Sequence, residues 1–512
     1  MPLRRRRRPP EPPQHIAYRL AAAPDPLAAI RDTSAAYGHG LYLGMSDEGW
    51  VSAHPESCLL VLGPPRSGKS SGLIVPNVLA ANGPVLSAST KPDVLNWTME
   101  ARRQVGRCWV LAPPGTPLPP QAVPLRWSPV QAATTWDGAM VVAQNMVEAA
   151  APGRHDEEAR HFAGRSTTLL APMLHAAALE DLSMREVMPW VLGREADVPQ
   201  QILERHGAWL AADSLGDIRQ TDVREQSGIW SWTSQALKAY HTEAGLALTD
   251  DPNFDPDAFV RSRDTVYVIG PADQQKLYAP LVVGLVDDVR QAGYVRFHEA
   301  AAMDVPVPPV LLLLDETKNI APLPNLPSIV SESGGQGVLV VASFQDLSQA
   351  RERWGVEAEG FLTLFTTKVV LPGIAEPQTV QNISMLAGSH DQQSYSRTVA
   401  PSQQIGHVGP IPIMSGPQVS HHYGVHKEPV LDPAVIHRGA PGRALLLNEQ
   451  GHFWVHLTPA FAAEPWARVT DLRKHVVLAP TRAPRREPSP PEPRLAPPGP
   501  EIAQDRDLDL GL

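Results

Sequence analysis

The sequence predicts an α/β protein with a mostly parallel central sheet and an inserted all-helical segment. Short, nearly continuous apolar runs such as 310–314 and 338–343 recur along the chain, as in strands that are covered on both faces. Helical stretches join these runs, which is the pattern of an α/β domain. From about 137 to 250 the strand-like runs disappear, and Ala-rich amphipathic segments replace them.

The order of the expected strands follows from these apolar runs. Seven runs are short enough to be buried strands, and two further runs near the carboxyl end alternate between apolar and polar residues. The first group comprises 58–62, 84–86, 108–111, 265–270, 310–314, 338–343 and 368–371, and the second comprises 443–448 and 452–457.

A chain of 512 residues is too long for one hydrophobic core, so we expect two or three domains. Residues 1–40 are expected to form a flexible basic arm. The α/β domain is expected to be discontinuous, over 41–136 and 251–477, with the helical insertion at 137–250 between its two parts. The Pro-rich, charged residues 478–512 are expected to be a disordered tail.

Charge and composition narrow the possible functions. The net charge is −10, so the chain is not a general nucleic-acid-coating protein, and any DNA contact must come from a local basic patch. Arg4 to Arg8 could form such a contact, could bind acidic lipid headgroups, or could be a solvated arm. Only Cys58 and Cys108 are present, both in apolar runs. A disulfide or a Cys-based zinc site is therefore not expected, which fits the cytoplasm.

The sequence contains no apolar window long enough for a membrane-spanning helix, and its amino end lacks the apolar stretch of a secretory signal. We therefore expect a cytoplasmic protein, either free or peripheral at the inner face of the cell membrane.

A phosphate-binding loop follows the first buried strand. Residues 63–70, GPPRSGKS, match G-x-x-x-x-G-K-[ST] at every fixed position, between a strand and a helix. In this motif the backbone N–H groups and the helix N-terminus face the β-phosphate. Lys69 is expected to bridge the β- and γ-phosphates, and the Ser70 hydroxyl to bind Mg²⁺. The expected ATP-binding set is Gly63, Pro64, Pro65, Arg66, Ser67, Gly68, Lys69, Ser70 and Ser71.

A second motif ends the Leu-rich strand at 310–314. Asp315 and Glu316 follow it directly, and ligands of open α/β sheets bind at the carboxyl ends of the strands. Asp315 is expected to hold the Mg²⁺ shell, and Glu316 to polarise the attacking water. Gln345 follows the next strand and either senses the γ-phosphate or caps the strand.

Two other clusters have a structural and a functional interpretation. His421, His422 and His426 suggest a metal site, but they lack a carboxylate or Cys companion, so a solvated loop or edge strand is favoured. Trp230 and Trp232 could stack on DNA bases, although packing in a core is the favoured interpretation.

The motifs together resemble one family. Five segments are similar to those of the type IV coupling proteins of conjugation. They are GPPRSGKSSGLIVP at 63–76, STKPD at 89–93, GRCWVLAP at 106–113, the long segment 311–349 and TKVVLPG at 367–373. These proteins are the TraG/TraD-like branch of the FtsK/HerA motor superfamily. The resemblance covers roughly residues 40–460, and the segment around 311–349 is its most specific part.

The resemblance implies a RecA-like P-loop domain that uses ATP and Mg²⁺. It also implies a homo-hexameric ring that pumps DNA, expected to be single-stranded, from a relaxase to membrane secretion-channel proteins. By motif match, Lys69 and Ser70 bind phosphate and Mg²⁺. Asp315 and Glu316 serve hydrolysis, and Gln345 couples the γ-phosphate to motion.

The sequence departs from the family pattern in two places. Family members usually begin with transmembrane helices, which this sequence lacks, and Thr317-Lys318 stands where an aromatic or apolar pair is more usual. An arginine finger that acts on a neighbouring subunit is not assigned, and Lys368 is the basic strand residue considered for that position.

Two alternative functions remain open at this point. The chain could be an adaptor that docks protein cargo and uses nucleotide only to assemble a ring, or a HerA-like DNA-processing motor with a nuclease partner. Stimulation of hydrolysis by DNA separates the translocase from the adaptor, and a neighbouring relaxase or nuclease gene separates the two motors.

Overall fold

The structure is a computed structural model that describes residues 13–113, 115–150, 157–270, 275–401, 404–414 and 417–470. The arginines at 4–8 and the expected tail at 478–512 lie outside the described residues, so the predictions for them are not addressed by the structure.

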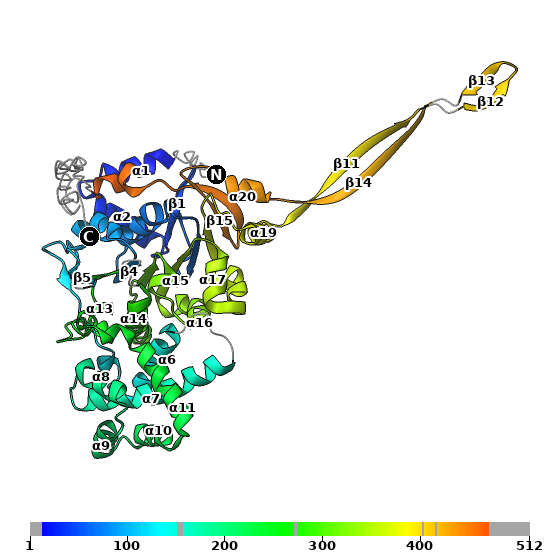
Figure 1. Cartoon of the computed structure of the whole chain (residues 1–512). Coiled ribbons are helices and arrows are strands. Elements are labelled where there is room, and N and C mark those ends of the chain that lie inside the picture. Colours follow the sequence, from blue (N-terminus) through cyan, green and yellow to red (C-terminus); the bar gives the residue numbers. More distant parts are fainter. Residues whose placement is uncertain are drawn as a thin grey trace, which may run out of the picture. The chain divides into compact units, whose positions relative to one another are not determined.

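A twelve-stranded sheet forms the centre of the protein (Figure 1), in the order β2-β1-β16-β15-β10-β3-β9-β8-β4-β7-β5-β6. Pairing is parallel from β10 through β6 and antiparallel from β2 to β10. The strands are β1 Tyr42–Ser46, β2 Gly49–Ser52, β3 Leu59–Leu62, β4 Val85–Ser89, β5 Cys108–Leu111, β6 Val123–Pro124, β7 Thr265–Ile269, β8 Val310–Leu314, β9 Val338–Phe344, β10 Thr367–Val370, β15 Arg443–Asn448 and β16 Gly451–His456. The predicted α/β fold with a mostly parallel sheet is confirmed.

The apolar runs of the sequence are continuous because the sheet is buried on both faces. Successive side chains of a strand point to opposite faces. In β8, Leu312 and Leu314 enter one hydrophobic core, and Leu311 and Leu313 enter the other. The first core lies against α14 (Gln275–Ala302) and helices between β6 and β7. The second lies against α3 (Val75–Ala80) and α4 (Asp93–Arg102).

The amino end differs from the expected flexible arm. Residues 13–21 form α1 (Pro13–Ala21), and α2 (Pro26–Ala36) packs against α3. Asp25 caps α2 by accepting a 3.0 Å hydrogen bond from Ala28 N, and its Leu27 and Ile30 are buried. An arm extending to residue 40 is therefore wrong, because the cap and the apolar face of α2 tie this segment to the core.

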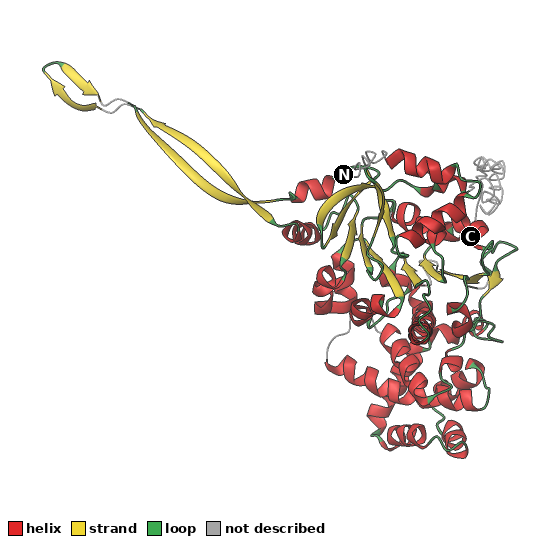
Figure 2. Ribbon diagram, turned by 180° about the vertical axis from the view of Figure 1, so that it is seen from behind, coloured by secondary structure: helices red, strands yellow, loops and turns green. Residues whose placement is uncertain are grey.

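All described elements between β6 and β7 are helical, and Figure 2 shows this part as helices and loops. We call α5 to α13 the helical block: α5 Pro129–Ala132, α6 Trp136–Ala150, α7 Glu157–Leu179, α8 Met184–Gly193, α9 Asp197–Arg205, α10 Trp209–Gln220, α11 Val223–Ala236, α12 Glu243–Leu246 and α13 Pro256–Val260. Trp230 is buried in its core, and Trp232 stacks on Phe162 with ring centroids 6.1 Å apart. The domain limits at 137 and 250 remain a prediction.

The remaining helices follow strands of the carboxyl half of the chain. They are α15 Thr317–Ile320, α16 Leu326–Glu332, α17 Leu347–Trp354, α18 Phe361–Leu364, α19 Pro377–Leu386 and α20 Pro433–Arg438.

A long two-stranded ribbon between α19 and α20 was not expected (Figure 1). β11 (Ser389–Ala400) and β14 (Gln418–Pro429) pair antiparallel in unbroken register, and β12 (Gln404–Val408) pairs with β13 (Ile411–Met414). His421, His422 and His426 are exposed on β14, so the edge-strand interpretation of this histidine cluster is confirmed. No group of metal-ligating side chains occurs within the described part of the chain.

Candidate nucleotide-binding site

The predicted phosphate loop joins the end of β3 to a π-helical turn at Ser70–Ile74, which leads into α3. Gly68 has φ +97°, a conformation that L side chains rarely adopt. Gly63 is required for space, because a Cβ there would lie 2.8 Å from Ser67 Oγ and 2.9 Å from Leu371 Cβ. Pro65 and Arg66 are exposed on the loop. The two glycines thus fix the turn that aims the start of the helix at the site.

Lys69 folds back over its own loop. Its side chain is 8% exposed, and Nζ donates hydrogen bonds to the carbonyl oxygens of Gly63 and, at 3.2 Å, Pro64. Burial lowers the pKa of Lys69, while the charges of Asp315 and Glu316 act in the opposite direction. The ammonium group is therefore held by two neutral carbonyls and lies beside two carboxyl groups. It can leave the carbonyls to bind an anionic ligand.

Asp315 and Ser70 meet at the edge of the sheet. Ser70 Oγ donates a hydrogen bond to Asp315 Oδ2, and Ser89 Oγ donates to the same oxygen at 3.4 Å. Asp315 Oδ1 is buried and has no hydrogen-bond partner among the described residues. Burial raises the pKa of Asp315 to about 6. A hydroxyl and a carboxylate with a free buried oxygen are the hard oxygen donors that Mg²⁺ prefers, so these residues fit a magnesium ion.

Glu316 lies beside this pair and remains partly exposed. Asn319 Nδ2 donates a 3.3 Å hydrogen bond to its Oε2. Burial raises the pKa of Glu316, although the charge of Lys69 opposes this shift. A carboxylate with a raised pKa that still reaches solvent can accept a proton from water.

Strand order brings these groups together. β9 lies between β3 and β8 and is parallel to both, so the loop after β3, Gln345 after β9, and Asp315 and Glu316 after β8 share one edge. The backbone N–H of Gln345 donates to Gln349 Oε1 at 2.9 Å. The expected adjacency of Gln345 to the Asp-Glu strand is present. The catalytic roles of these residues remain predictions.

Three neighbours of the site were not assigned a role from the sequence. Ser89 ends β4, next to β8, and contacts Asp315, whereas Asn319 contacts Glu316. The charge of Lys91 opposes the rise that burial causes in the pKa of Glu316. For Ser89 and Lys91 the available signal was the STKPD sequence at 89–93, which begins at the last residue of a buried strand.

The two unusual residues after Glu316 are accommodated without disturbing the site. Thr317 is buried, its Oγ1 donates to Leu314 O at 3.1 Å, and it accepts a 3.0 Å hydrogen bond from Ser343 N. Lys318 forms an ion pair with Glu352. Their polar groups are thus satisfied within the fold.

Lys368 lies near the amino end of β10, level with Leu60 of β3. The shared site edge begins after the carboxyl end of that strand, so the structure does not bring Lys368 to this subunit's own site. Burial lowers its pKa.

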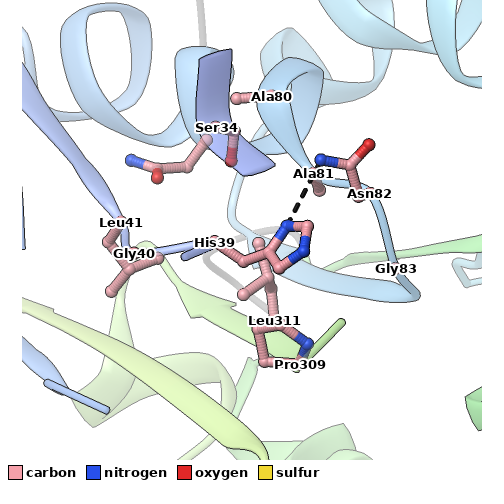
Figure 3. A pocket seen from close by; sticks show the side chains of 11 residues that line it. Ser34, His39, Gly40, Leu41, Ala80, Ala81, Asn82, Gly83, Pro309 and Leu311 are labelled. Atoms are coloured by element: carbon pink, nitrogen blue, oxygen red, sulfur yellow. Dashed lines mark hydrogen bonds between the residues drawn. The ribbon is translucent and has the colours of Figure 1, made fainter. Parts of the chain in front are cut away.

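A small cavity lies at the opposite edge of the sheet, before β4 and β8 (Figure 3). It has a volume of about 10 Å³ and is lined by residues that include His39, Asn82 and Pro309. His39 Nδ1 and Asn82 Nδ2 are 3.3 Å apart, and Asn82 also donates to Arg31 O at 2.9 Å. This volume is at the lower limit for holding one water molecule, so the cavity cannot hold a nucleotide.

Comparison with known proteins identifies the family. A family model described as type IV secretory system conjugative DNA transfer matches residues 31–406. The chain belongs to this family. Its function is therefore in conjugative DNA transfer, as the sequence predicted. None of the curated proteins matches the chain. No helix in the described ranges is long and apolar enough to cross a membrane.

Solved structures of conjugative coupling proteins share the fold of this family member. The unbound monoclinic form of TrwBdeltaN70 matches with a TM-score of 0.59 and 17% identity, covering 84% of this chain and 92% of that one. Plasmid coupling protein TrwB in complex with ADP and Mg²⁺ matches at 0.56 and 18%, covering 79% and 86%. TrwB with the ATP analogue ADPNP matches at 0.56 and 19%, with the same coverage. The fold is thus that of a conjugative coupling protein.

Proposed function

We propose that this chain is the ATP-driven, Mg²⁺-dependent motor of a conjugative system, which translocates DNA from a relaxase to the secretion channel. The observation that carries the proposal is the contact between Ser70 and Asp315, with Lys69 and Glu316 beside it, at one edge of the sheet of a conjugative DNA transfer protein. The TrwB complexes with ADP and Mg²⁺ and with an ATP analogue support nucleotide use.

Each residue of the site has one proposed task. Lys69 exchanges its two carbonyl acceptors for the β- and γ-phosphates, and the backbone N–H groups after Gly68 contact the β-phosphate. Ser70 and Asp315 would hold Mg²⁺. The bound ion would neutralise the negative charge that develops on the phosphates.

Glu316 accepts the proton of the attacking water. Its raised pKa brings the carboxylate closer to the pH at which a general base works best. Gln345, one strand away, contacts the γ-phosphate. When the γ-phosphate is released, the resulting movement of Gln345 shifts α17, which begins two residues later.

We propose a homo-hexameric ring in which each nucleotide lies at a subunit boundary, with single-stranded DNA in a central channel. The discontinuous domain at 41–136 and 251–477 forms the motor, and the insertion at 137–250 selects or gates what enters. Because its partners would be a relaxase and membrane channel proteins, the ring is placed in the cytoplasm at the inner face of the cell membrane.

The rate of ATP hydrolysis, measured with and without single-stranded DNA, tests this function. A motor should be stimulated by DNA, and Glu316→Gln should abolish both the basal and the stimulated rate while ADPNP still binds. Hydrolysis that is indifferent to DNA would remove the translocase and favour a cargo-docking adaptor. Failure of the wild-type protein to bind ADPNP would overturn nucleotide use altogether.

A further inference from the structure

Helix α17 connects the nucleotide edge with the helical block. It begins after Gln345, and Asp346 caps it by accepting a 3.0 Å hydrogen bond from Ser348 N. The backbone N–H of Leu347 donates to Thr379 Oγ1 at 3.0 Å, which fixes the first turn. The position of this helix is therefore set at its amino end by the residues that follow β9 and by Thr379 of α19.

The last turn of α17 holds a buried arginine that touches two distant segments. Arg353 is 6% exposed, and its Nη2 donates to Pro322 O at 3.0 Å and to Glu148 O at 3.2 Å. Pro322 belongs to the loop that follows Glu316 and α15, and Glu148 belongs to the last turn of α6 in the helical block. One guanidinium group thus joins the segment after the catalytic carboxylates to the block.

The charge of Arg353 makes this a stiff connection. Burial lowers its pKa to about 10, so the side chain stays charged at neutral pH. The last carbonyls of a helix carry partial negative charge and are favourable acceptors for a cation. Separating either carbonyl from the guanidinium would leave buried charge less well compensated, so the end of α6 should follow any movement of the loop.

The two residues beside Arg353 bind α17 to the segment that follows Glu316. Trp354 Nε1 donates to Leu323 O at 2.9 Å, and its ring contacts Phe344 edge-on, with centroids 5.7 Å apart. Glu352 forms an ion pair with Lys318 of α15. Phe344 is the last residue of β9, so Trp354 links the loop at 321–323 to β9, and Glu352 links α17 to α15, which follows β8.

A cleft of about 550 Å³ adjoins this junction. Its lining includes Arg160 of α7 and Trp232 of α11, from the helical block, together with Asn325, Trp354 and Glu357. Glu148 of α6 and Arg353 also line the cleft, so the contact between them lies in its wall.

We propose that Arg353 is the positioning residue that transmits changes at Asp315 and Glu316 to the helical block, by keeping the carboxyl end of α6 on the loop at 321–323. This inference rests on the proposed function, since nucleotide binding and hydrolysis are what change the site edge.

Hydrogen exchange on the full chain, with and without Mg²⁺ and ADPNP, tests the proposal without relying on activity. In the wild-type protein, the analogue should protect amides at 63–71 and also change exchange at 142–150 of α6. Arg353→Met should keep the first effect and lose the second. Arg351→Met is the matched control, because Arg351 lies on the same helix but pairs with Glu376 at 2.7 Å, and it should keep both effects.

Arg353→Lys provides a second variant if the methionine variant does not fold. Lysine retains the charge but lacks the planar fork that reaches both carbonyls, so the change at 142–150 should be reduced. An undiminished response of α6 in Arg353→Met or in Arg353→Lys overturns the proposal, as does a wild-type α6 that is unaffected while 63–71 is protected. A wild-type protein without protection at 63–71 overturns the proposed function, and this inference with it.

Discussion

The Ser70 hydroxyl donates a hydrogen bond to Asp315 Oδ2, although 245 residues separate them in the chain. Ser70 opens the helix after β3, and Asp315 follows β8, with β9 lying between the two strands. The contact thus reports the strand order of the sheet. It also places a hydroxyl and a carboxylate where both can bind one magnesium ion. The residues of this site are therefore the first that should be substituted.

Substitution of the catalytic residues should separate binding from turnover. Lys69→Ala should lose both ADPNP binding and hydrolysis, because the phosphates lose their cationic partner. Glu316→Gln should bind the analogue normally while its hydrolysis rate falls by about 10²–10⁴-fold, the usual contribution of a general base. Calorimetry and a phosphate-release assay give the two readouts, and Glu332→Gln, at the exposed end of α16, serves as the control. Normal turnover in Glu316→Gln would show that another group activates the water.

The stability of the nucleotide-free protein should depend on the protonation of Asp315. Its folded pKa of about 6 exceeds the ordinary carboxyl value, so the folded protein binds this proton more tightly than the unfolded chain. That stabilisation is fully present below pH ~4 and is lost as the pH rises through about 6.

Asp315→Asn cannot ionise, so it should raise Tm at pH 7.5 by a few degrees, because the rise of the pKa from 3.8 to about 6 corresponds to about 3 kcal/mol. At pH 3.5 it should have little effect, since the wild-type carboxyl is then largely protonated in both the folded and the unfolded states. Thermal unfolding of the nucleotide-free protein at both pH values measures the difference, and an equal effect at both would contradict the assignment.

Arg102 should be a major contributor to the stability of the sheet edge opposite the nucleotide site. It is buried, and its guanidinium donates to Thr265 Oγ1 at 2.7 Å and to the carbonyls of Ala81, Gly83 and Arg263. Arg102→Met leaves these buried acceptors without a donor and should cost about 3 kcal/mol of unfolding free energy. Urea denaturation measures this cost. The adjacent Arg103 is exposed, so Arg103→Met should unfold as the wild type does, and similar midpoints for both variants would refute the prediction.

Removal of the long ribbon should leave the motor intact. The side chains of β11 are exposed almost throughout, and β14 is its paired strand. Joining His390 to Glu428, which face each other in the ladder, through a short Asn-Gly turn should therefore leave the Tm and the basal ATPase rate unchanged. A lower Tm would mean that the ribbon stabilises the rest of the chain.

The proposed ring predicts that activity depends on protein concentration, DNA and salt together. The ATPase rate per subunit should rise with protein concentration, because a neighbour completes each site, and single-stranded DNA should raise it further. Since the chain is acidic overall, DNA must bind through local cationic groups, and stimulation should fade between about 50 and 200 mM salt. Titration of protein at two salt concentrations, with and without DNA, provides the measurement. A rate per subunit that is constant under all these conditions would contradict the ring motor.

The sequence by itself determined most strands of the sheet and the local motifs, although not β1, β2 or β6. Buried parallel strands need apolar residues on both faces, so 310–314 and 338–343 could be recognised without a fold, and the glycines of 63–70 mark a backbone turn that few other residues permit. Other features were decided only by the tertiary structure. They are the order of β3, β9 and β8, the contact of Ser70 with Asp315, the helices of the amino end, the pairing of β11 with β14, and the hydrogen bond of Arg353 to α6. These features depend on contacts between residues far apart in the chain, which local periodicity does not encode, and their polar partners are largely backbone carbonyls, which leave no signature in the sequence.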